Sequence, residues 1–185
     1  DYSGNKTSYS YDTSGNLTEI IYADGSKTAY EYDELNRLVK ETGQDGNTVI
    51  RSYTGALVSS CTDADGNTAS YSYNSMGKLI TLTDAAGNIT RYMWDKAGNQ
   101  TGTQAPDGGF TEYTLNKSGN VTAVTDALGY RTDFEYDGNR NIIKATDPEG
   151  NAVTCTYDGN GNKLDSTDAE GNKTIYMYDA GNRLV

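Results

Sequence analysis

A 21-residue period runs through the whole chain and constrains its fold more than any other feature. Two landmarks share this period. The first is an aromatic or large apolar residue at Tyr11, Tyr32, Tyr53, Tyr73, Trp94, Leu115, Tyr136, Tyr157 and Tyr178. The second is a glycine at Gly4, Gly25, Gly46, Gly66, Gly87, Gly108, Gly129, Gly150 and Gly171. One interval in each series is 20 residues instead of 21. A fixed period of this size is typical of an array in which one supersecondary unit repeats.

Each period contains two turn signals, so the chain reverses about every ten or eleven residues. The second series of turn positions is Gly15, Asn36, Gly77, Gly98, Gly119, Arg140, Gly161 and Asn182. Many turns read Asp or Asn, two residues, then Gly. This order suits a type I turn that is completed by a left-handed residue. Asn is the next best left-handed residue after Gly, whereas Arg140 fits this position poorly, and we expect a local distortion there.

The segments between the turns are short and have the alternation of β-strands. Tyr30-Glu31-Tyr32, Tyr71-Ser72-Tyr73 and Tyr176-Met177-Tyr178 place two aromatic side chains on one face of a strand. The returning segments carry aliphatic residues at matching positions, so aromatic and aliphatic rows should interleave across the sheet. The predicted fold class is therefore all-β, with tandem 21-residue β-hairpins that form a curved, twisted, antiparallel sheet. One unit, Tyr53-Thr54-Gly55-Ala56-Leu57, is shortened and lacks the Asp, and there we expect a tighter turn or an irregular bend.

The composition excludes several functional classes. The formal net charge of −11 disfavours binding to nucleic acid or to an anionic lipid surface. The chain has no His, which removes the commonest general base and the commonest metal ligand. Most Asp residues occupy turn positions that explain them without catalysis, so we expect no enzymatic activity and no cofactor. Asp63-Ala64-Asp65-Gly66 resembles the start of a calcium loop, but Asn74 stands where the loop needs Glu, and we predict no metal site.

No apolar run in the sequence is long enough to cross a membrane, so no membrane insertion is expected. The two cysteines, Cys61 and Cys155, occupy different positions within the repeat, and we interpret them as free thiols. The chain starts at Asp1 and stops at Val185 within a further repeat. We therefore interpret residues 1–185 as a single array of about nine repeats that is truncated at both ends.

The unit Tyr-Asp-x-x-Gly-Asn/Arg-Leu, followed eight residues later by Gly-Asn, resembles the YD or Rhs repeat. Clear copies are Tyr11–Leu17 and Tyr32–Leu38. Such repeats occur in bacterial Rhs and wall-associated polymorphic toxins, in the C component of insecticidal toxin complexes, and in teneurins. In these relatives a strip of β-hairpins spirals into a hollow shell, which in the toxins encloses a C-terminal toxic domain.

The resemblance implies a non-catalytic structural scaffold. It would be a segment of the shell of a secreted or surface-displayed bacterial protein that encapsulates or displays a toxin or effector domain. The implied partners are the remaining shell and the enclosed C-terminal domain. Nine repeats are too few to close a shell, so we expect two open edges and edge-to-edge self-association.

The alternative is a carbohydrate-binding or adhesion module, because exposed Tyr and Trp rings on a sheet can stack on sugars. Its candidate binding residues are Tyr30, Tyr32, Tyr71, Tyr73, Tyr92, Trp94, Tyr176 and Tyr178. The competing interpretation is an aromatic ladder that packs against itself.

Overall fold

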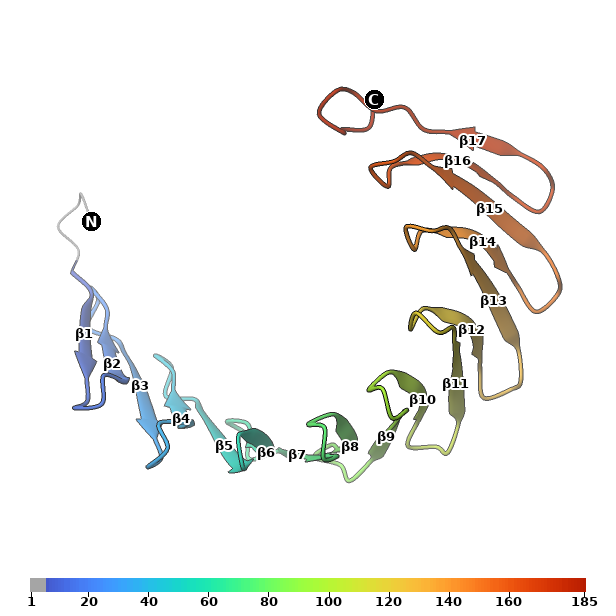
Figure 1. Ribbon diagram of the computed structural model, residues 1–185. Coiled ribbons are helices and arrows are strands. Elements are labelled where there is room, and N and C mark those ends of the chain that lie inside the picture. The colour runs from blue at the N-terminus through green and yellow to red at the C-terminus, as the bar shows by residue number, and fades with distance from the viewer. Residues whose placement is uncertain (1–5) are drawn as a thin grey trace. The chain divides into compact units, whose positions relative to one another are not determined.

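The structure, a computed structural model, describes residues 6–185 and contains only β-strands and turns in that range (Figure 1). The predicted turn at Asp1–Gly4 lies outside the described residues. The chain divides into two compact units, Asp1–Thr90 and Arg91–Val185. Seventeen antiparallel strands belong to a single sheet over residues 6–185, which confirms the predicted all-β class. In the described part of the chain there is no helix long and apolar enough to cross a membrane.

The strands are short and follow one another with almost constant spacing. In the first unit they are β1 (Ser8–Tyr11), β2 (Leu17–Ile21), β3 (Lys27–Tyr32), β4 (Leu38–Thr42), β5 (Thr48–Thr54), β6 (Leu57–Thr62), β7 (Thr68–Tyr73) and β8 (Leu79–Thr83). Strand β9 (Ile89–Trp94) spans the boundary between the units. The second unit continues with β10 (Gln100–Gln104), β11 (Phe110–Leu115), β12 (Val121–Thr125), β13 (Arg131–Tyr136), β14 (Ile142–Thr146), β15 (Ala152–Tyr157), β16 (Lys163–Thr167) and β17 (Lys173–Ile175).

Sixteen turns of the described chain have the same hydrogen-bond pattern. The fourth residue donates its N–H to the carbonyl of the first, and the first donates to the carbonyl of the fifth, over 2.8–3.2 Å. The fourth residue has a positive φ in all sixteen, as a left-handed corner requires. In most turns the Asp or Asn at position one accepts N–H groups from positions three and five, as at Asp12 and Asp84. The predicted turn chemistry is therefore confirmed.

Two kinds of ladder join these strands. Strands that flank a Tyr-Asp turn, such as β3 and β4, pair from Ala29↔Thr42 to Tyr32↔Leu38 with a β-bulge beside the Tyr. Strands that flank the other turn, such as β4 and β5, form only three pairs, from Lys40↔Ile50 to Thr42↔Thr48. Next to such a Tyr-Asp turn, the backbone groups that face the neighbouring hairpin therefore lie beyond the end of the ladder and have no backbone partner there.

The sheet has a tyrosine-rich face and a polar face. In β7, β11 and β13 the exposed fraction alternates, so that Tyr71, Tyr113 and Phe134 are half-buried while Ser72 and Glu135 are exposed. We call the first side the Tyr face; it carries Tyr30, Tyr32, Tyr53, Tyr71 and Tyr73 in the first unit and Tyr113, Phe134, Cys155, Tyr136 and Tyr157 in the second. The polar face carries cross-strand ion pairs such as Lys40–Glu31 and Lys144–Glu135.

A closed hydrophobic core is absent from the described residues. Ala123, with no exposed surface, is the one fully buried hydrophobic residue among them, and Thr28 is the one buried polar residue. Stability must therefore come from many half-buried pairs between neighbouring strands, each contributing about 0.2–1 kcal/mol.

Candidate functional site

The eight aromatic residues predicted to bind a ligand are all half-buried. They come in pairs two residues apart, from β3, β7, β9 and the segment that follows β17. Within the first unit, the pair on β3 and the pair on β7 are separated by three strands, so they do not form one continuous aromatic patch. The structure does not test whether any of the eight binds a ligand.

Four tyrosines at the end of a strand, of which Tyr73 is one of the eight, make a structural hydrogen bond that the sequence did not reveal. Each hydroxyl donates to the carbonyl oxygen of the residue fifteen positions earlier, on the preceding strand. Four such bonds are present, Tyr53 to Leu38 (2.7 Å), Tyr73 to Val58 (2.9 Å), Tyr136 to Val121 (2.6 Å) and Tyr157 to Ile142 (3.0 Å). We call these bonds tyrosine rungs.

The three-pair ladders explain why the rungs are needed. The ladder between β4 and β5 ends at Lys40↔Ile50, so the carbonyl of Leu38 has no partner from the backbone of β5. An unpaired, half-buried carbonyl is costly, and the Tyr53 hydroxyl satisfies it. The rungs therefore attach consecutive hairpins to one another at the end where the strands diverge.

The shortened unit makes a turn of a different kind. Thr54 pairs with Leu57, so only Gly55 and Ala56 form the loop, and Gly55 has φ +60°. A positive φ at the first of two central residues is typical of a type II′ turn. The predicted tighter turn is confirmed.

Arg37, from the preceding turn, reaches over this short turn. Its guanidinium pairs with Asp33 at 2.5 Å, lies 4.6 Å from the centre of the Tyr53 ring and donates to the Gly55 carbonyl. A cation above an aromatic face is stabilising, and here it covers a Tyr ring that would otherwise be more exposed. Sequence reasoning missed this contact, because the period gives no information on which long side chain crosses between hairpins.

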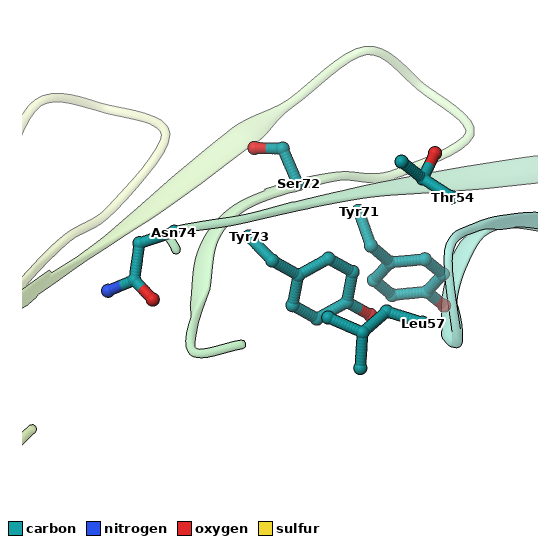
Figure 2. Close-up of a pocket in the computed structure, with 6 residues that line it drawn as sticks. All are labelled: Thr54, Leu57, Tyr71, Ser72, Tyr73 and Asn74. Atoms are coloured by element: carbon teal, nitrogen blue, oxygen red, sulfur yellow. The ribbon is translucent and has the colours of Figure 1, made fainter. Parts of the chain in front are cut away.

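A pocket of about 370 Å³ opens between this short turn and the end of β7, on the Tyr face of the first unit (Figure 2). Its lining residues are Thr54, Leu57, Tyr71, Ser72, Tyr73 and Asn74. Figure 2 shows the rings of Tyr71 and Tyr73 side by side, with Leu57 against them and Ser72 pointing away. Two of the eight predicted residues, Tyr71 and Tyr73, thus meet in a concave site.

Leu57 gives this pocket its apolar character. The fifth residue of the other Tyr-Asp turns is polar, namely Asn16, Arg37, Lys78, Asn99, Asn120, Asn141, Asn162 and Arg183. In two turns this Asn bonds to the Asn at position four of the next turn, Asn16 to Asn36 (2.8 Å) and Asn162 to Asn182 (3.0 Å). Leu57 occupies the corresponding place and lies against Gly77 instead. An apolar Leu in an otherwise polar series is the sequence signal that could have predicted this pocket.

The hydrogen bonds that cap the turns also change the pKa values of the turn carboxylates. The pKa values of Asp12, Asp33, Asp63 and Asp84 lie below their ordinary value, first because the side chain of the fifth turn residue bonds to the carboxylate and then because backbone N–H groups do. These carboxylates therefore stay charged in the folded chain and act as caps. No group of three or more Cys, Asp and Glu that could hold a metal ion exists among residues 6–185.

The comparisons with known proteins agree with this geometry. A model of the RHS repeat matches residues 1–27, 11–48, 52–89, 77–109 and 116–152. No curated protein matches the chain in sequence.

Solved structures show the same fold at low identity. The crystal structure of TcdB2-TccC3-TEV is 18% identical, with a TM-score of 0.76, over 97% of this chain and 11% of that chain. A Tc holotoxin pore from Photorhabdus luminescens is 16% identical, with a TM-score of 0.75, over 97% of this chain and 12% of that one. The complex TcdB2-TccC3-Cdc42 is 15% identical, with a TM-score of 0.55, over 97% and 14%.

The chain thus spans about a seventh or less of these toxin structures. Its period, its capped turns and the family model that matches most of its length lead to one conclusion: the chain belongs to the RHS repeat family.

Proposed function

We propose that this chain is a non-catalytic segment of a β-shell. The observation that carries the proposal is the set of hydrogen bonds by which one hairpin satisfies polar groups of its neighbour. Tyrosine hydroxyls and two of the turn amides bond to the neighbouring repeat, and the turn carboxylates cap N–H groups of their own turn. Polar groups used in these hydrogen bonds hold the sheet together, and they leave few polar groups for catalysis. The fold match to TcdB2-TccC3 structures over 97% of the chain supports the same role.

The finer proposal is that the complete shell encapsulates or displays a toxin or effector domain of a secreted or surface-exposed bacterial protein. Support comes from the neighbours, which are a Tc holotoxin pore and TcdB2-TccC3 complexes, one of them solved without a hypervariable C-terminal region. The acidic charge of −11 favours solubility of a large exposed sheet.

Protease protection tests this proposal in the polypeptide that carries residues 1–185. We expect a domain carried with the repeats to resist a protease concentration that digests the same domain alone. A double variant, Gly87→Val with Gly129→Val, removes two left-handed corners and should abolish the protection. Equal digestion of the free and the carried domain would contradict encapsulation.

A second candidate function is the binding of a sugar ring in the pocket beside Leu57. The observation that favours it is the pair of adjacent, half-buried Tyr rings that line a concave, mainly apolar site. Titration calorimetry with a panel of glycans should then give saturable binding that Tyr71→Ala abolishes. Tyr113→Ala, at a half-buried Tyr outside the pocket and outside the eight candidates, is the matched control. Binding that survives Tyr71→Ala, or no binding across the panel, would exclude this function for the pocket.

A further inference from the structure

The sequence repeats a modification signal that the shell role does not use, the tripeptide Asn-x-Ser/Thr. This tripeptide is the acceptor for attachment of a sugar to the Asn side chain. Six copies lie wholly within residues 6–185, and they begin at Asn16, Asn88, Asn99, Asn116, Asn120 and Asn172. The sugar is attached to the side-chain nitrogen Nδ2. A copy is therefore competent in the folded chain only where this nitrogen is unbonded and the whole tripeptide is accessible.

Five of the six copies begin at the fifth residue of a turn and continue into a strand. Their Asn residues are Asn16, Asn88, Asn99, Asn120 and Asn172, and the Thr that ends each copy lies in β2, β9, β10, β12 or β17. The backbone of a strand residue is engaged in the ladders of the sheet. A transferase would have to break these ladders before it could bind such a tripeptide in its own groove.

The acceptor nitrogen is also occupied in four of these five copies. It donates to the carboxylate of the first turn residue, from Asn16 to Asp12 (2.9 Å), Asn88 to Asp84 (2.8 Å), Asn99 to Asp95 (2.9 Å) and Asn172 to Asp168 (2.9 Å). A hydrogen bond to a charged carboxylate is stronger than a neutral one, and it must break before the nitrogen can react. In the fifth copy Asn120 is half-buried, and the Thr122 hydroxyl donates to the Thr114 carbonyl at 3.3 Å.

Asn116 differs from the other five on each of these points. It is the first residue of the turn between β11 and β12, so Asn116, Lys117 and Ser118 all belong to the turn, and all three are exposed. Its Oδ1 accepts the N–H of Ser118 at 2.9 Å and that of Asn120 at 3.0 Å. These bonds hold the amide with its oxygen on the turn, while Nδ2 makes no hydrogen bond to any group of residues 6–185. Asn116 thus offers an oriented, unbonded nitrogen on an exposed tripeptide.

We propose that Asn116 is a glycosylation site that takes a hexose from a nucleotide-activated sugar. The Asn116 Nδ2 attacks the anomeric carbon of the sugar, and a C–N bond forms there. The bond from that carbon to the diphosphate oxygen breaks, and the nucleoside diphosphate leaves with the electron pair. The proton lost by Nδ2 passes to a base of the transferase. Because Oδ1 and not Nδ2 caps the turn, the turn can keep both of its capping bonds in the modified chain.

Incubation of the folded chain with UDP-glucose and a soluble transferase specific for Asn-x-Ser/Thr tests the proposal, with peptide mass spectrometry to locate the added hexose. Asn172 is the matched comparison, since its tripeptide is also exposed and also has Lys in the middle. Thr174→Ser makes the two tripeptides identical. In that chain we expect Asn116 to react at least about tenfold faster than Asn172, because Nδ2 of Asn172 must first leave the Asp168 carboxylate.

Synthetic peptides separate the effect of the fold from that of the sequence. Peptides of residues 111–123 and of residues 167–179 with Thr174→Ser should react at similar rates, because an isolated hairpin of this length is at best marginally stable. Equal rates at Asn116 and Asn172 in the folded chain would overturn the proposal. A folded chain in which Asn116 stays unmodified, under conditions that modify its peptide, would overturn it as well.

Two substitutions in the first unit create new copies of the tripeptide in the two settings. Met76→Ser completes a copy at Asn74, whose Oδ1 caps its turn as that of Asn116 does, and this copy should react fast. Ala69→Ser completes a copy at Asn67, whose Nδ2 donates to Asp63 at 3.1 Å and which continues into β7, and this copy should react slowly. Circular dichroism confirms folding of each variant. Equal rates at the two new copies would show that the position in the turn does not select the site.

Discussion

At the scale of single residues, the left-handed corner tolerates more side chains than its glycines suggest. Asn36, Arg140 and Asn182 occupy it with φ of 59°, 69° and 59°. The expected distortion at Arg140 is not observed, since both turn hydrogen bonds persist at 3.0 and 3.2 Å. The two bonds and the Asp137 cap together hold a residue that would otherwise resist this conformation.

Replacing Gly87 isolates the backbone cost of such a corner. Gly87 has φ +85°, and a Cβ added there would meet no atom within 4 Å. Gly87→Val should therefore lower the free energy of unfolding by about 1–2 kcal/mol through conformation alone. Gly87→Asn is the matched control, because Asn already occupies two such corners, and it should cost less. Urea denaturation measures both, and equal stabilities of the two variants would contradict the assignment.

Gly102 is required for a different reason, namely close packing. A Cβ at this position would lie 2.6 Å from the Phe110 ring and 3.0 Å from the Thr111 carbonyl oxygen. Gly102→Ala should therefore destabilise the chain by about 1–3 kcal/mol. Gly138→Ala, where a Cβ meets nothing, is the control and should change stability little. A thermal melt that shows equal shifts for both would refute the packing argument.

At the scale of elements, the tyrosine rungs join hairpins whose ladders end early. Tyr73→Phe removes only the hydroxyl that bonds to Val58 at 2.9 Å. We expect a loss of about 0.5–1.5 kcal/mol, with faster amide exchange between β6 and β7. Tyr71→Phe is the matched control on the same strand, since no rung from Tyr71 is present among the described residues. If the two Phe variants behave alike in hydrogen exchange, the rungs do not stabilise the array.

The recurrence of the tyrosine rungs also predicts a substitution that should stabilise the chain. Leu115 stands where other repeats have the rung-forming Tyr, and the residue fifteen positions earlier is Gln100. Leu115→Tyr should place a hydroxyl near the Gln100 carbonyl and raise the free energy of unfolding by about 0.5–1.5 kcal/mol. Leu115→Phe separates ring packing from the hydrogen bond. No gain of Tyr over Phe in urea denaturation would show that the rung does not form there.

Most of the strands and turns could be predicted because the period repeats their local chemistry many times. The Asp-x-x-Gly order fixes each corner from residues only a few positions apart, and the short turn at Gly55 departs from it visibly. The contacts between neighbouring hairpins could not be predicted in the same way. The rungs, the reach of Arg37 to Tyr53 and the pocket at Leu57 depend on which side chains meet across strands, and no spacing in the sequence determines that. The ligand-binding role of the eight aromatic residues stays a prediction.

At the scale of the whole molecule, capped carboxylates make stability depend on pH. Lowered pKa values occur at Asp12, Asp33, Asp63, Asp84, Asp95, Asp137, Asp147, Asp158, Asp168 and Asp179. A carboxyl whose pKa falls on folding contributes stability above its unfolded pKa, and this contribution is lost as the pH falls through the folded pKa. The melting temperature should therefore be steady above about pH 5 and fall steeply below about pH 4.

A triple variant, Asp63→Asn with Asp84→Asn and Asp168→Asn, should flatten that fall. Asn caps the equivalent turns at Asn74 and Asn116 without titrating, so the backbone bonds can persist. Calorimetry across the acidic range compares the two chains. Parallel melting curves for both would show that acid acts elsewhere.

Contacts within each unit join only strands that are consecutive in the chain, such as β5 with β6 and β13 with β14. Within each unit, no described strand contacts a strand from a distant part of the sequence. A gene that encodes such an array can therefore gain or lose a 21-residue block by recombination between copies, because the new neighbours present the same surfaces as the old. Length then becomes a quantity that evolution can tune in single steps, and the volume a finished wall surrounds can change without the invention of a new fold.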